Sequence, residues 1–303
     1  MKDLIKLSIP ATTANLGPGF DCLGMALDIW NQIELRPSER PALRVKGEGA
    51  GSLSTGRYNL VYKAAERYFR EAGLPVPSLS ITCRNQIPLA RGLGSSSSAI
   101  VGGLLAASAV AGAKGLDLDL IWRLAVEMEG HPDNVTAALF GGCQIVVRDQ
   151  ETLLHAQVPF PEDLRAVMFI PDTPMPTEKA RGILSPQVSR EDAVYNAGRV
   201  ALLINALATG RLEYLRVATQ DRLHQPARQA LMPAMRLLFR SALEAGALGV
   251  FLSGAGPTVL ALTQGRELTI AYEMADMADK ALLPGQVRIT RPIMQGAHII
   301  PED

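Results

Sequence analysis

The chain has 303 residues, enough for one large domain or two of about 150 residues each. Hydrophobic residues make up 48% and charged residues 20%, as in a soluble protein with a sizeable core. Thirty Lys and Arg balance thirty Asp and Glu, and no long run of one charge occurs. This balance argues against nucleic acid or an acidic membrane surface as the partner.

The cysteines argue for a reducing compartment. Cys22, Cys83 and Cys143 are scattered, odd in number and without a CxxC pair, so neither a disulfide framework nor a cysteine zinc site is expected. The N-terminus lacks the apolar core of a signal peptide, and we expect a cytoplasmic protein. The uncharged stretch 92–113 holds an apolar helix of about 15 residues, shorter than the ~20 that a membrane span needs. We predict a buried core helix there.

The first half of the chain is rich in predicted strands. A Gly/Pro-rich segment at 10–24 is predicted to be a shaped loop rather than a core element. Helical spacing predicts helices over 58–73, 99–113 and 117–130. Apolar patterns predict strands over 4–11, 25–37, 41–49, 78–88, 141–149, 152–160 and 165–172.

The second half is mostly helical before it becomes mixed. Two strands around a glycine turn are predicted within 248–265, and a final strand over 285–292. Helices are predicted over 177–184, 189–209, 211–223, 227–245 and 267–282. The order predicts an α+β fold with two units that meet without a flexible tether, 1–160 and 161–303.

The stretch PLARGLGSSSSA, residues 88–99, joins a predicted strand to the apolar helix. Glycines let the backbone approach a ligand closely, and the unpaired N–H groups at a helix start attract phosphate. The alternative is a simple helix N-cap, because serines often cap helices. The loop alone does not decide between these two interpretations.

The stretch EMEGHPDNV, residues 127–135, gathers carboxylates, an imidazole and an amide at a helix end. Carboxylates there could ligate Mg²⁺, and His131 and Asn134 could hydrogen-bond a polar substrate. The histidine has too few partners for a zinc site. The alternative is an ordinary capped helix end, with Pro132 as its stop signal.

Two further glycine-rich stretches have possible binding roles. Asn15 and Asp21 in segment 10–24 could bind an amine or a hydroxyl, although the segment could be an ordinary hairpin connection. The turn SGAGPTV at 253–259, taken alone, favours a tight hairpin over a binding role.

Together with TEKAR at 177–181 and LHQPAR at 223–228, these stretches resemble the GHMP kinase superfamily, and within it the homoserine kinase branch. PLARGLGSS matches the superfamily pattern Pro-x-x-x-Gly-Leu-Gly-Ser-Ser, and PATTANLGPGFDCLG and SGAGPT match its other two motifs. NLGPGFD, EGHPDNV with the following LFGG, TEKAR and LHQPAR are typical of the branch. The matches keep the expected order from residue 10 to 259.

The resemblance implies ATP-dependent phosphorylation of the side-chain hydroxyl of L-homoserine, a step toward threonine. It implies ATP and Mg²⁺ as cofactors and a two-domain GHMP kinase fold. The N-terminal half would resemble domain 2 of ribosomal protein S5 and the C-terminal half a ferredoxin-like unit, with the substrates between them. A homodimer is the expected assembly.

The resemblance also assigns site residues. Asp21 suits the ammonium of the zwitterionic substrate, and Arg181 and Arg228 suit its carboxylate. Substrate contacts are assigned to Asn15, Asp21, His131, Asn134, Thr177, Arg181 and Arg228. Nucleotide contacts are assigned to Asn59, Pro88, Leu89, Ala90, Arg91, Gly92, Leu93, Gly94, Ser95, Ser96, Ser97 and Ser98.

The implied catalysis is mainly electrostatic. Ser96 and Glu127 would hold Mg²⁺; Glu129 is the alternative, and we prefer Glu127 because it lies inside the helix rather than at its frayed end. Asn134 stands where some branches have an aspartate base and would orient the hydroxyl. Its neighbour Asp133 keeps a general-base mechanism open.

Two rival interpretations follow from the same residues. One is another small-molecule kinase of the superfamily, acting on a mevalonate-like or sugar substrate. The other is a binding module that keeps the fold and senses an amino acid, against which the intact serine loop and acidic residues argue.

Overall fold

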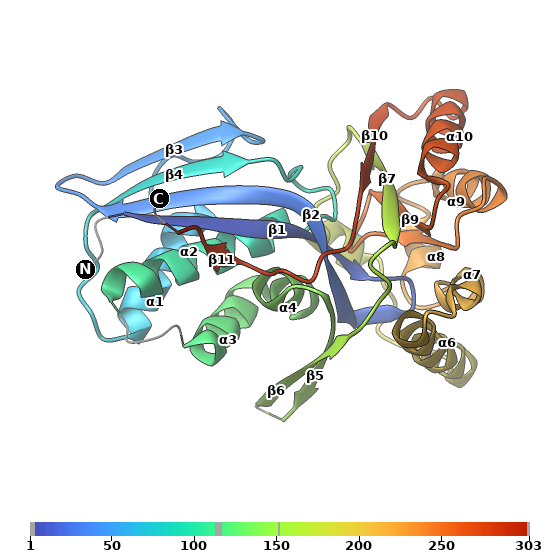
Figure 1. Ribbon diagram of the computed structural model, residues 1–303, viewed down its shortest axis with the longest axis horizontal. Helices are drawn as coiled ribbons and strands as arrows, with labels where there is room; N and C mark the ends of the chain where they lie inside the picture. The colour runs from blue at the N-terminus through green and yellow to red at the C-terminus, as the bar shows by residue number, and fades with distance from the viewer. Residues whose placement is uncertain (1–3, 113–116, 151, 302–303) are drawn as a thin grey trace.

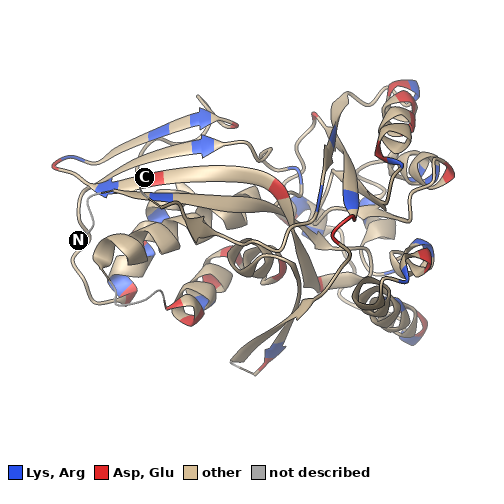
Figure 2. Ribbon diagram, in the orientation of Figure 1, with Lys and Arg blue, Asp and Glu red and all other residues tan. Residues whose placement is uncertain are grey.

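The molecule consists of two α+β halves that lie side by side (Figure 1). The computed structural model describes residues 4–112, 117–150 and 152–301. The α+β class is confirmed. Lysines and arginines are interspersed with acidic residues on the helices of both halves (Figure 2).

The first half contains a sheet of seven strands in the described residues, ordered β11-β1-β2-β4-β3, with β5 pairing β2 and β6 pairing β5. Helices α1 to α4 lie on one face of this sheet (Figure 1). The strands are β1 (Ile5–Asn15), β2 (Gly19–Pro37), β3 (Ala42–Gly47), β4 (Leu79–Asn85), β5 (Cys143–Asp149), β6 (Thr152–Val158) and β11 (His298–Ile299). The helices are α1 (Leu60–Glu71), α2 (Ser95–Ala111), α3 (Leu118–Glu129) and α4 (Asp133–Phe140).

The second half contains a four-stranded antiparallel sheet, ordered β10-β7-β9-β8. Its chain order, a strand, helices, two strands, a helix and a strand, is the ferredoxin-like pattern. The strands are β7 (Arg165–Pro171), β8 (Gly249–Leu252), β9 (Val259–Thr263) and β10 (Gly285–Thr290). The helical segments are α5 (Thr177–Gly182), α6 (Arg190–Thr209), η1 (Leu212–Tyr214), α7 (Leu215–Ala218), α8 (Gln225–Arg228), α9 (Met235–Glu244) and α10 (Glu267–Lys280).

Helix α2 is the buried core helix that the sequence predicts. Most of its side chains are buried between the sheet, α1 and α3. A Cβ on Gly103 would lie 2.5 Å from the carbonyl oxygen of Val61, so glycine is what allows α1 to approach so closely. None of the helices in the described ranges has both the length and the apolarity to cross a membrane.

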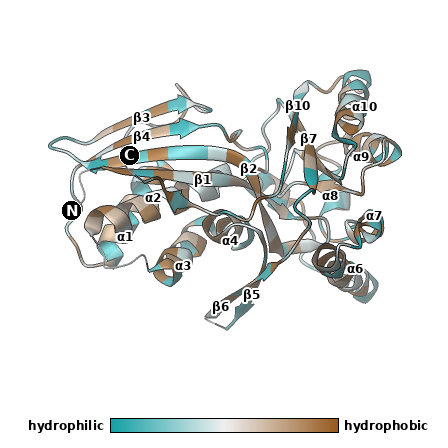
Figure 3. Ribbon diagram, viewed as in Figure 1, coloured by the Kyte–Doolittle hydropathy of each residue, from teal (hydrophilic) through white to brown (hydrophobic). Residues whose placement is uncertain are grey.

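Successive side chains of a strand point to opposite faces of its sheet. Along the second half of β2, residues 28–36, buried positions alternate with more exposed ones, and hydrophobic residues are interspersed with hydrophilic ones (Figure 3). On β7, Met168 faces a core shared with the first half, whereas Val167 and Phe169 face the core under α9 and α10. The second sheet is therefore covered on both faces.

The halves meet through a common core rather than a tether, as predicted. One cluster of buried side chains includes Ala11 and Met25 of the first half with Leu203 and Leu260 of the second. The chain also returns after β10 to the first half, where Leu7 of β1 pairs with Ile299 of β11. The last described residues thus lie in the first sheet, although the predicted boundary assigns everything after 160 to the second half.

Three predicted segments differ from the structure. Segment 10–24 is mostly strand: β1 runs to Asn15 and β2 starts at Gly19, so only a short turn separates them. The helices predicted over 211–223 and 227–245 are broken into η1, α7, α8 and α9. Residues 133–140, which follow the predicted helix end, form helix α4.

Candidate active site

The seven predicted substrate-binding residues line one small cavity of about 90 Å³. It lies where β1, β2, α4 and the start of α2 face α5, α8 and the turn between β8 and β9, so both halves contribute to it. Glu129 and Asp133 also line it. The residues predicted are Asn15, Asp21, His131, Asn134, Thr177, Arg181 and Arg228.

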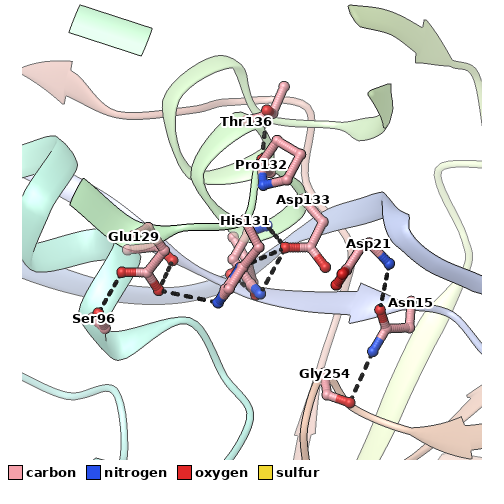
Figure 4. Close-up of polar contacts among 12 residues, drawn as sticks. Asn15, Asp21, Ser96, Glu129, His131, Pro132, Asp133, Thr136 and Gly254 are labelled. Atoms are coloured by element: carbon pink, nitrogen blue, oxygen red, sulfur yellow. Dashed lines mark hydrogen bonds and ion pairs between the residues drawn. The ribbon is translucent and has the colours of Figure 1, made fainter. Parts of the chain in front are cut away.

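The end of the β1–β2 hairpin carries two of these residues in an unusual backbone conformation. Asn15 and Asp21 have φ angles of +68° and +57°, which non-glycine residues rarely adopt. The Asn15 side chain accepts a hydrogen bond from the Asp21 backbone N–H (3.1 Å) and donates one to the carbonyl oxygen of Gly254 (2.9 Å; Figure 4). These contacts fix the Asp21 carboxylate at the cavity wall.

Asp21 and Arg181 pair across the cavity between the two halves. Two guanidinium nitrogens donate to the two carboxylate oxygens at 2.6 and 2.9 Å, in a bidentate arrangement. The hydrogen bonds to Asp21 raise the pKa of Arg181 above its usual value, against the effect of burial. Both side chains are 35% exposed, so solvent weakens the pair and a ligand can reach it.

Arg228 is the second cation at the cavity, and it is only 1% exposed. Its Nε donates to the carbonyl oxygen of Ala180 (3.2 Å), and its Nη1 donates to that of Gly254 (3.0 Å) and to Nδ1 of His224 (2.9 Å). Burial, and then the charge of Arg181, lower its pKa to about 10, so it remains charged at neutral pH. Its Nη2 has no hydrogen-bond partner among the described residues.

The first turn of α4 and the residue before Pro132 supply a third polar group (Figure 4). Oδ1 of Asp133 accepts from the backbone N–H of Asn134 (2.8 Å) and lies 2.9 Å from Nδ1 of His131. Burial lowers the pKa of His131, but the hydrogen bond and charge of Asp133 and the charge of Glu129 outweigh it and raise the pKa. Oδ1 of Asn134 accepts a hydrogen bond from the Thr12 hydroxyl (2.8 Å).

Glu129, at the end of α3, faces the start of α2. Its two carboxylate oxygens accept hydrogen bonds from the hydroxyls of Ser96 (2.5 Å) and Ser97 (2.9 Å). Its side chain is 9% exposed and lines the cavity. A carboxylate and a hydroxyl therefore meet beside the glycine-rich loop.

Glu127 is a predicted site residue that the structure does not bring to the cavity. Its side chain is 45% exposed and pairs with Arg67 and Arg123, each at 3.1 Å, on the surface of α1 and α3. Residues two apart in a helix lie about 200° apart around its axis, so Glu127 and Glu129 point in opposite directions. Of the two acids, Glu129 lines the cavity and Glu127 does not.

The glycine-rich loop and the start of α2 form the remaining wall. The N-cap of α2 is Gly94, whose φ of +70° is left-handed and which offers no side chain for a cap. A Cβ on Gly94 would lie 1.9 Å from the Thr12 hydroxyl oxygen. The serines therefore do not act as the N-cap. The loop residues at the cavity are Ala90, Arg91, Gly92, Leu93, Gly94, Ser95 and Ser96.

Three of the predicted nucleotide-contacting residues line neither this cavity nor the adjoining cavity around Asn59. They are Pro88, Ser97 and Ser98. The Ser98 hydroxyl is buried and bonds the Asn31 side chain and the carbonyl oxygen of Ser95, both at 3.0 Å. Ser97 bonds Glu129 and contributes through that residue.

Arg91 uses its guanidinium to tie the loop to the second half. It donates to the carbonyl oxygens of Pro171 (2.6 Å), Leu89 (2.9 Å) and Asp172. These bonds leave Arg91 less available for a phosphate than the prediction assumes.

A second cavity of about 250 Å³ adjoins the first and shares Ala90, Ser95 and Ser96 with it. Asn59, the predicted adenine-side residue, lines this cavity. Its amide caps α1 by accepting from the Val61 N–H (3.0 Å) and donates to the Ser54 carbonyl oxygen (2.9 Å). Other residues on its walls are Ile33, Leu53, Tyr58, Leu60, Asn85, Leu89 and Ala99.

Sequence reasoning does not identify two residues that organise the site. Thr12 holds the Asn134 amide, and the carbonyl of Gly254 receives both Asn15 and Arg228. Both belong to quoted motifs, PATTAN and SGAGPT. A backbone carbonyl carries no side-chain signal, and a threonine in a strand is ordinary, so position in the motif is the only clue.

Comparisons with known proteins agree along the chain. The family described as "GHMP kinases N terminal domain" matches residues 59–142, and "GHMP kinases C terminal" matches 203–280. A homoserine kinase of Synechococcus sp. is 47% identical over 262 residues, which are 86% of this chain and 85% of the relative. A homoserine kinase of Moorella thermoacetica is 41% identical over 292 residues, 96% of this chain and 98% of the relative.

Solved structures show the same relationship. A homoserine kinase from Cytophaga hutchinsonii superposes with a TM-score of 0.88 at 32% identity, covering 99% of this chain and 98% of that one. A mevalonate diphosphate decarboxylase from Staphylococcus aureus has a TM-score of 0.73 at 16% identity, a likeness of fold alone. The chain therefore has the GHMP kinase fold and belongs to the homoserine kinase family.

Proposed function

We propose that the protein transfers the γ-phosphoryl group of ATP to the side-chain hydroxyl of L-homoserine, giving O-phospho-L-homoserine for threonine synthesis. The single observation that carries this proposal is the pair of adjoining cavities that share Ala90, Ser95 and Ser96. One cavity is lined by charged groups and the other by apolar side chains. Membership in the homoserine kinase family supports the same reaction.

ATP fits with its base in the second cavity and its phosphates over the shared wall. Apolar side chains such as Leu53 and Leu89, with the amide-bearing Asn59 and Asn85, suit a planar heterocycle. The start of α2, with glycine as its N-cap, presents backbone N–H groups and the positive end of the helix dipole to phosphate.

The donor set beside the loop fits Mg²⁺. The cation prefers hard oxygen ligands and takes only one or two carboxylates together with phosphate oxygens. The Glu129 carboxylate and Ser96 hydroxyl supply such oxygens. Bound there with ATP, Mg²⁺ would neutralise phosphate charge. We thus place Glu129 in the role that the sequence assigned to Glu127.

The amino-acid end of homoserine fits the Asp21–Arg181 pair. The substrate is a zwitterion, so its ammonium can be accepted by Asp21 and its carboxylate by Arg181 and by the unbonded Nη2 of Arg228. Thr177 and Asn15 complete the wall.

The hydroxyl end fits the first turn of α4. Asn134, fixed by Thr12 and Asp133, orients the hydroxyl, and its amide cannot take a proton. Oδ1 of Asp133 already accepts from Asn134 and faces His131. We therefore propose that Asp133 positions these neighbours and that the hydroxyl proton leaves with the phosphoryl group or with water.

ADP release measured with L-homoserine, L-threonine, L-serine and mevalonate tests the proposed function. We expect kcat/KM for homoserine to exceed that for each alternative by about 100-fold or more. Absence of homoserine-dependent ADP release would favour a binding module, and faster turnover of mevalonate would favour another kinase of the superfamily.

We also propose a cytoplasmic homodimer. The cysteines Cys22, Cys83 and Cys143 are free thiols, which suits a reducing compartment, and closed dimers are the commonest oligomers. Light scattering on the purified protein should give twice the mass of one chain; the mass of one chain would contradict the dimer.

A further inference from the structure

We propose that His224 is a positioning residue that holds the Arg228 guanidinium in place for the substrate carboxylate. This inference rests on the proposed function, since it assigns a task to a residue behind the carboxylate-binding wall. His224 does not line the cavity and is 0% exposed, so it does not itself meet a ligand.

The hydrogen bonds of His224 fix its tautomer. Its Nδ1 lies 2.9 Å from Nη1 of Arg228, and its Nε2 lies 2.8 Å from the carbonyl oxygen of Gly17. An arginine nitrogen can only donate, so Nδ1 must be the acceptor and the ring proton must be on Nε2. That proton is donated to Gly17, in the turn between β1 and β2. The imidazole thus links Arg228 to the hairpin that carries Asp21.

The surroundings keep the ring in that state. Nε2 also lies 3.6 Å from Asp221, whose carboxylate accepts the backbone N–H groups of Leu223, His224 and Gln225 at 2.9, 3.0 and 2.7 Å. Asp221 therefore anchors the backbone that carries the imidazole. Burial lowers the pKa of His224 to about 4, against the charge of Asp221, so the ring is neutral at neutral pH.

The Phe20 ring packs beside both His224 and Arg228. The Phe20 ring stacks on His224 with centroids 5.3 Å apart, and the Cζ of Arg228 lies 5.5 Å from its centroid. With Nε on Ala180 and Nη1 on Gly254 and His224, the guanidinium has one orientation that leaves Nη2 for a ligand. Loss of the Nδ1 acceptor would leave a buried N–H without a partner and let the guanidinium turn.

Two amide variants separate the two bonds of the ring. In His224→Asn the side-chain oxygen can stand where Nδ1 stands, which keeps the acceptor for Arg228. In His224→Gln the longer side chain can place its N–H near Nε2, which keeps the bond to Gly17 but not that acceptor. The pair therefore matches in polarity and differs in the contact that the proposal requires.

Steady-state kinetics of both variants is the test. We expect His224→Gln to raise the KM for homoserine roughly 10-fold or more, with the KM for ATP within about two-fold of wild type. We expect His224→Asn to keep the KM for homoserine within about three-fold of wild type. Equal homoserine KM values in wild type and His224→Gln, or parallel increases for both substrates, would overturn the positioning role.

A wild-type protein that does not phosphorylate homoserine would defeat the proposed function and this inference together, whereas an active wild type with an unaffected His224→Gln defeats the inference alone. The ¹⁵N spectrum of wild-type His224 gives a check that needs no variant. It should show a neutral ring protonated on Nε2 at neutral pH; a charged ring or an Nδ1–H tautomer would contradict the proposal.

Discussion

At the scale of single residues, Glu127 and Glu129 show how two acids in one helix can have different roles. Glu129 meets two serine hydroxyls at the cavity, whereas Glu127 pairs with Arg67 and Arg123 in solvent. Helix fraying favours Glu127 as the metal ligand from the sequence alone, whereas Glu129 is the acid that lines the cavity. The direction of each side chain around α3, which depends on the packing of α3 against α2, decides the matter.

The first prediction compares these two acids. Glu129→Gln removes the proposed metal-binding charge, so we expect kcat to fall by about 100-fold or more at saturating ATP and homoserine. Glu127→Gln breaks only exposed ion pairs, so its kcat should stay within about two-fold and its free energy of unfolding within about 1 kcal/mol of wild type. The measurement is ADP release across a Mg²⁺ titration. Full activity of Glu129→Gln would reject its assignment.

The second prediction concerns Asp133 and the hydroxyl proton. In Asp133→Asn the amide oxygen can still accept from His131 and from the Asn134 N–H, so positioning survives. We expect kcat to remain within about 10-fold of wild type, because a general base commonly contributes 10²–10⁴-fold. The pH profile of kcat should keep its shape. A larger loss, together with loss of the acidic limb, would identify Asp133 as the base.

At the scale of elements, helix α2 begins and ends at a left-handed glycine. Gly94 has φ +70° and Gly112 has φ +74°, so alanine at either position has a similar backbone cost of about 1–2 kcal/mol. A Cβ at Gly94 would meet Thr12 at 1.9 Å and Asn134 at 3.3 Å, whereas a Cβ at Gly112 has open space. Comparing alanine at the two positions therefore separates the effect of backbone strain from the effect of displacing site residues.

The third prediction uses this pair. Gly94→Ala should lower kcat/KM by roughly 10-fold or more, because the methyl group displaces the amide that orients the hydroxyl. Gly112→Ala should keep wild-type kinetics while showing a similar backbone contribution to destabilisation. Activity and thermal unfolding of both variants check this. Equal kinetic losses in the two variants would show that the N-terminal glycine has no special role.

Periodicity predicts the long elements well, and the short ones poorly. Burial is clearly periodic along the amphipathic α1 and along the second half of β2, residues 28–36. Asn59 caps α1 near its predicted start. Strand β11 has two residues and α8 has four, so neither has room for a period. Tertiary contacts stabilise them instead: β11 pairs with β1, and Asp221 accepts the N–H groups just before and at the start of α8.

At the scale of the whole molecule, the candidate site exists only because both halves share a core. Asn15 and Gly254, which bond each other, are 239 residues apart in the chain. Motif matching could therefore name most residues of the cavity, but not the contacts among them. The Asp21–Arg181 pair and the His224–Gly17 contact depend on how the halves dock.

The fourth prediction is that the two halves unfold together and that their free energy of unfolding falls at acid pH because of His224. The folded pKa of about 4 lies below the ordinary 6.5, so the unfolded chain takes up a proton first as pH falls. The stability that the neutral ring contributes is present above 6.5 and is lost toward pH 4, at no more than about 1.4 kcal/mol per pH unit.

Urea unfolding of wild type and His224→Asn at neutral pH and at pH about 5 tests that prediction. One transition is expected in each case, because buried side chains of both halves form one cluster. The stability advantage of wild type should narrow at the lower pH. A constant advantage would contradict the lowered pKa of His224, and two separate transitions would contradict the joint unfolding of the halves.

The most direct test of the central claim is the ³¹P spectrum of a reaction mixture containing the protein, ATP, Mg²⁺ and L-homoserine. Phosphoryl transfer in the cavity predicts a phosphomonoester signal that grows in step with ADP and couples to the side-chain CH₂ of homoserine. Release of the γ-phosphate only as inorganic phosphate, or an unchanged ATP spectrum, would contradict the account.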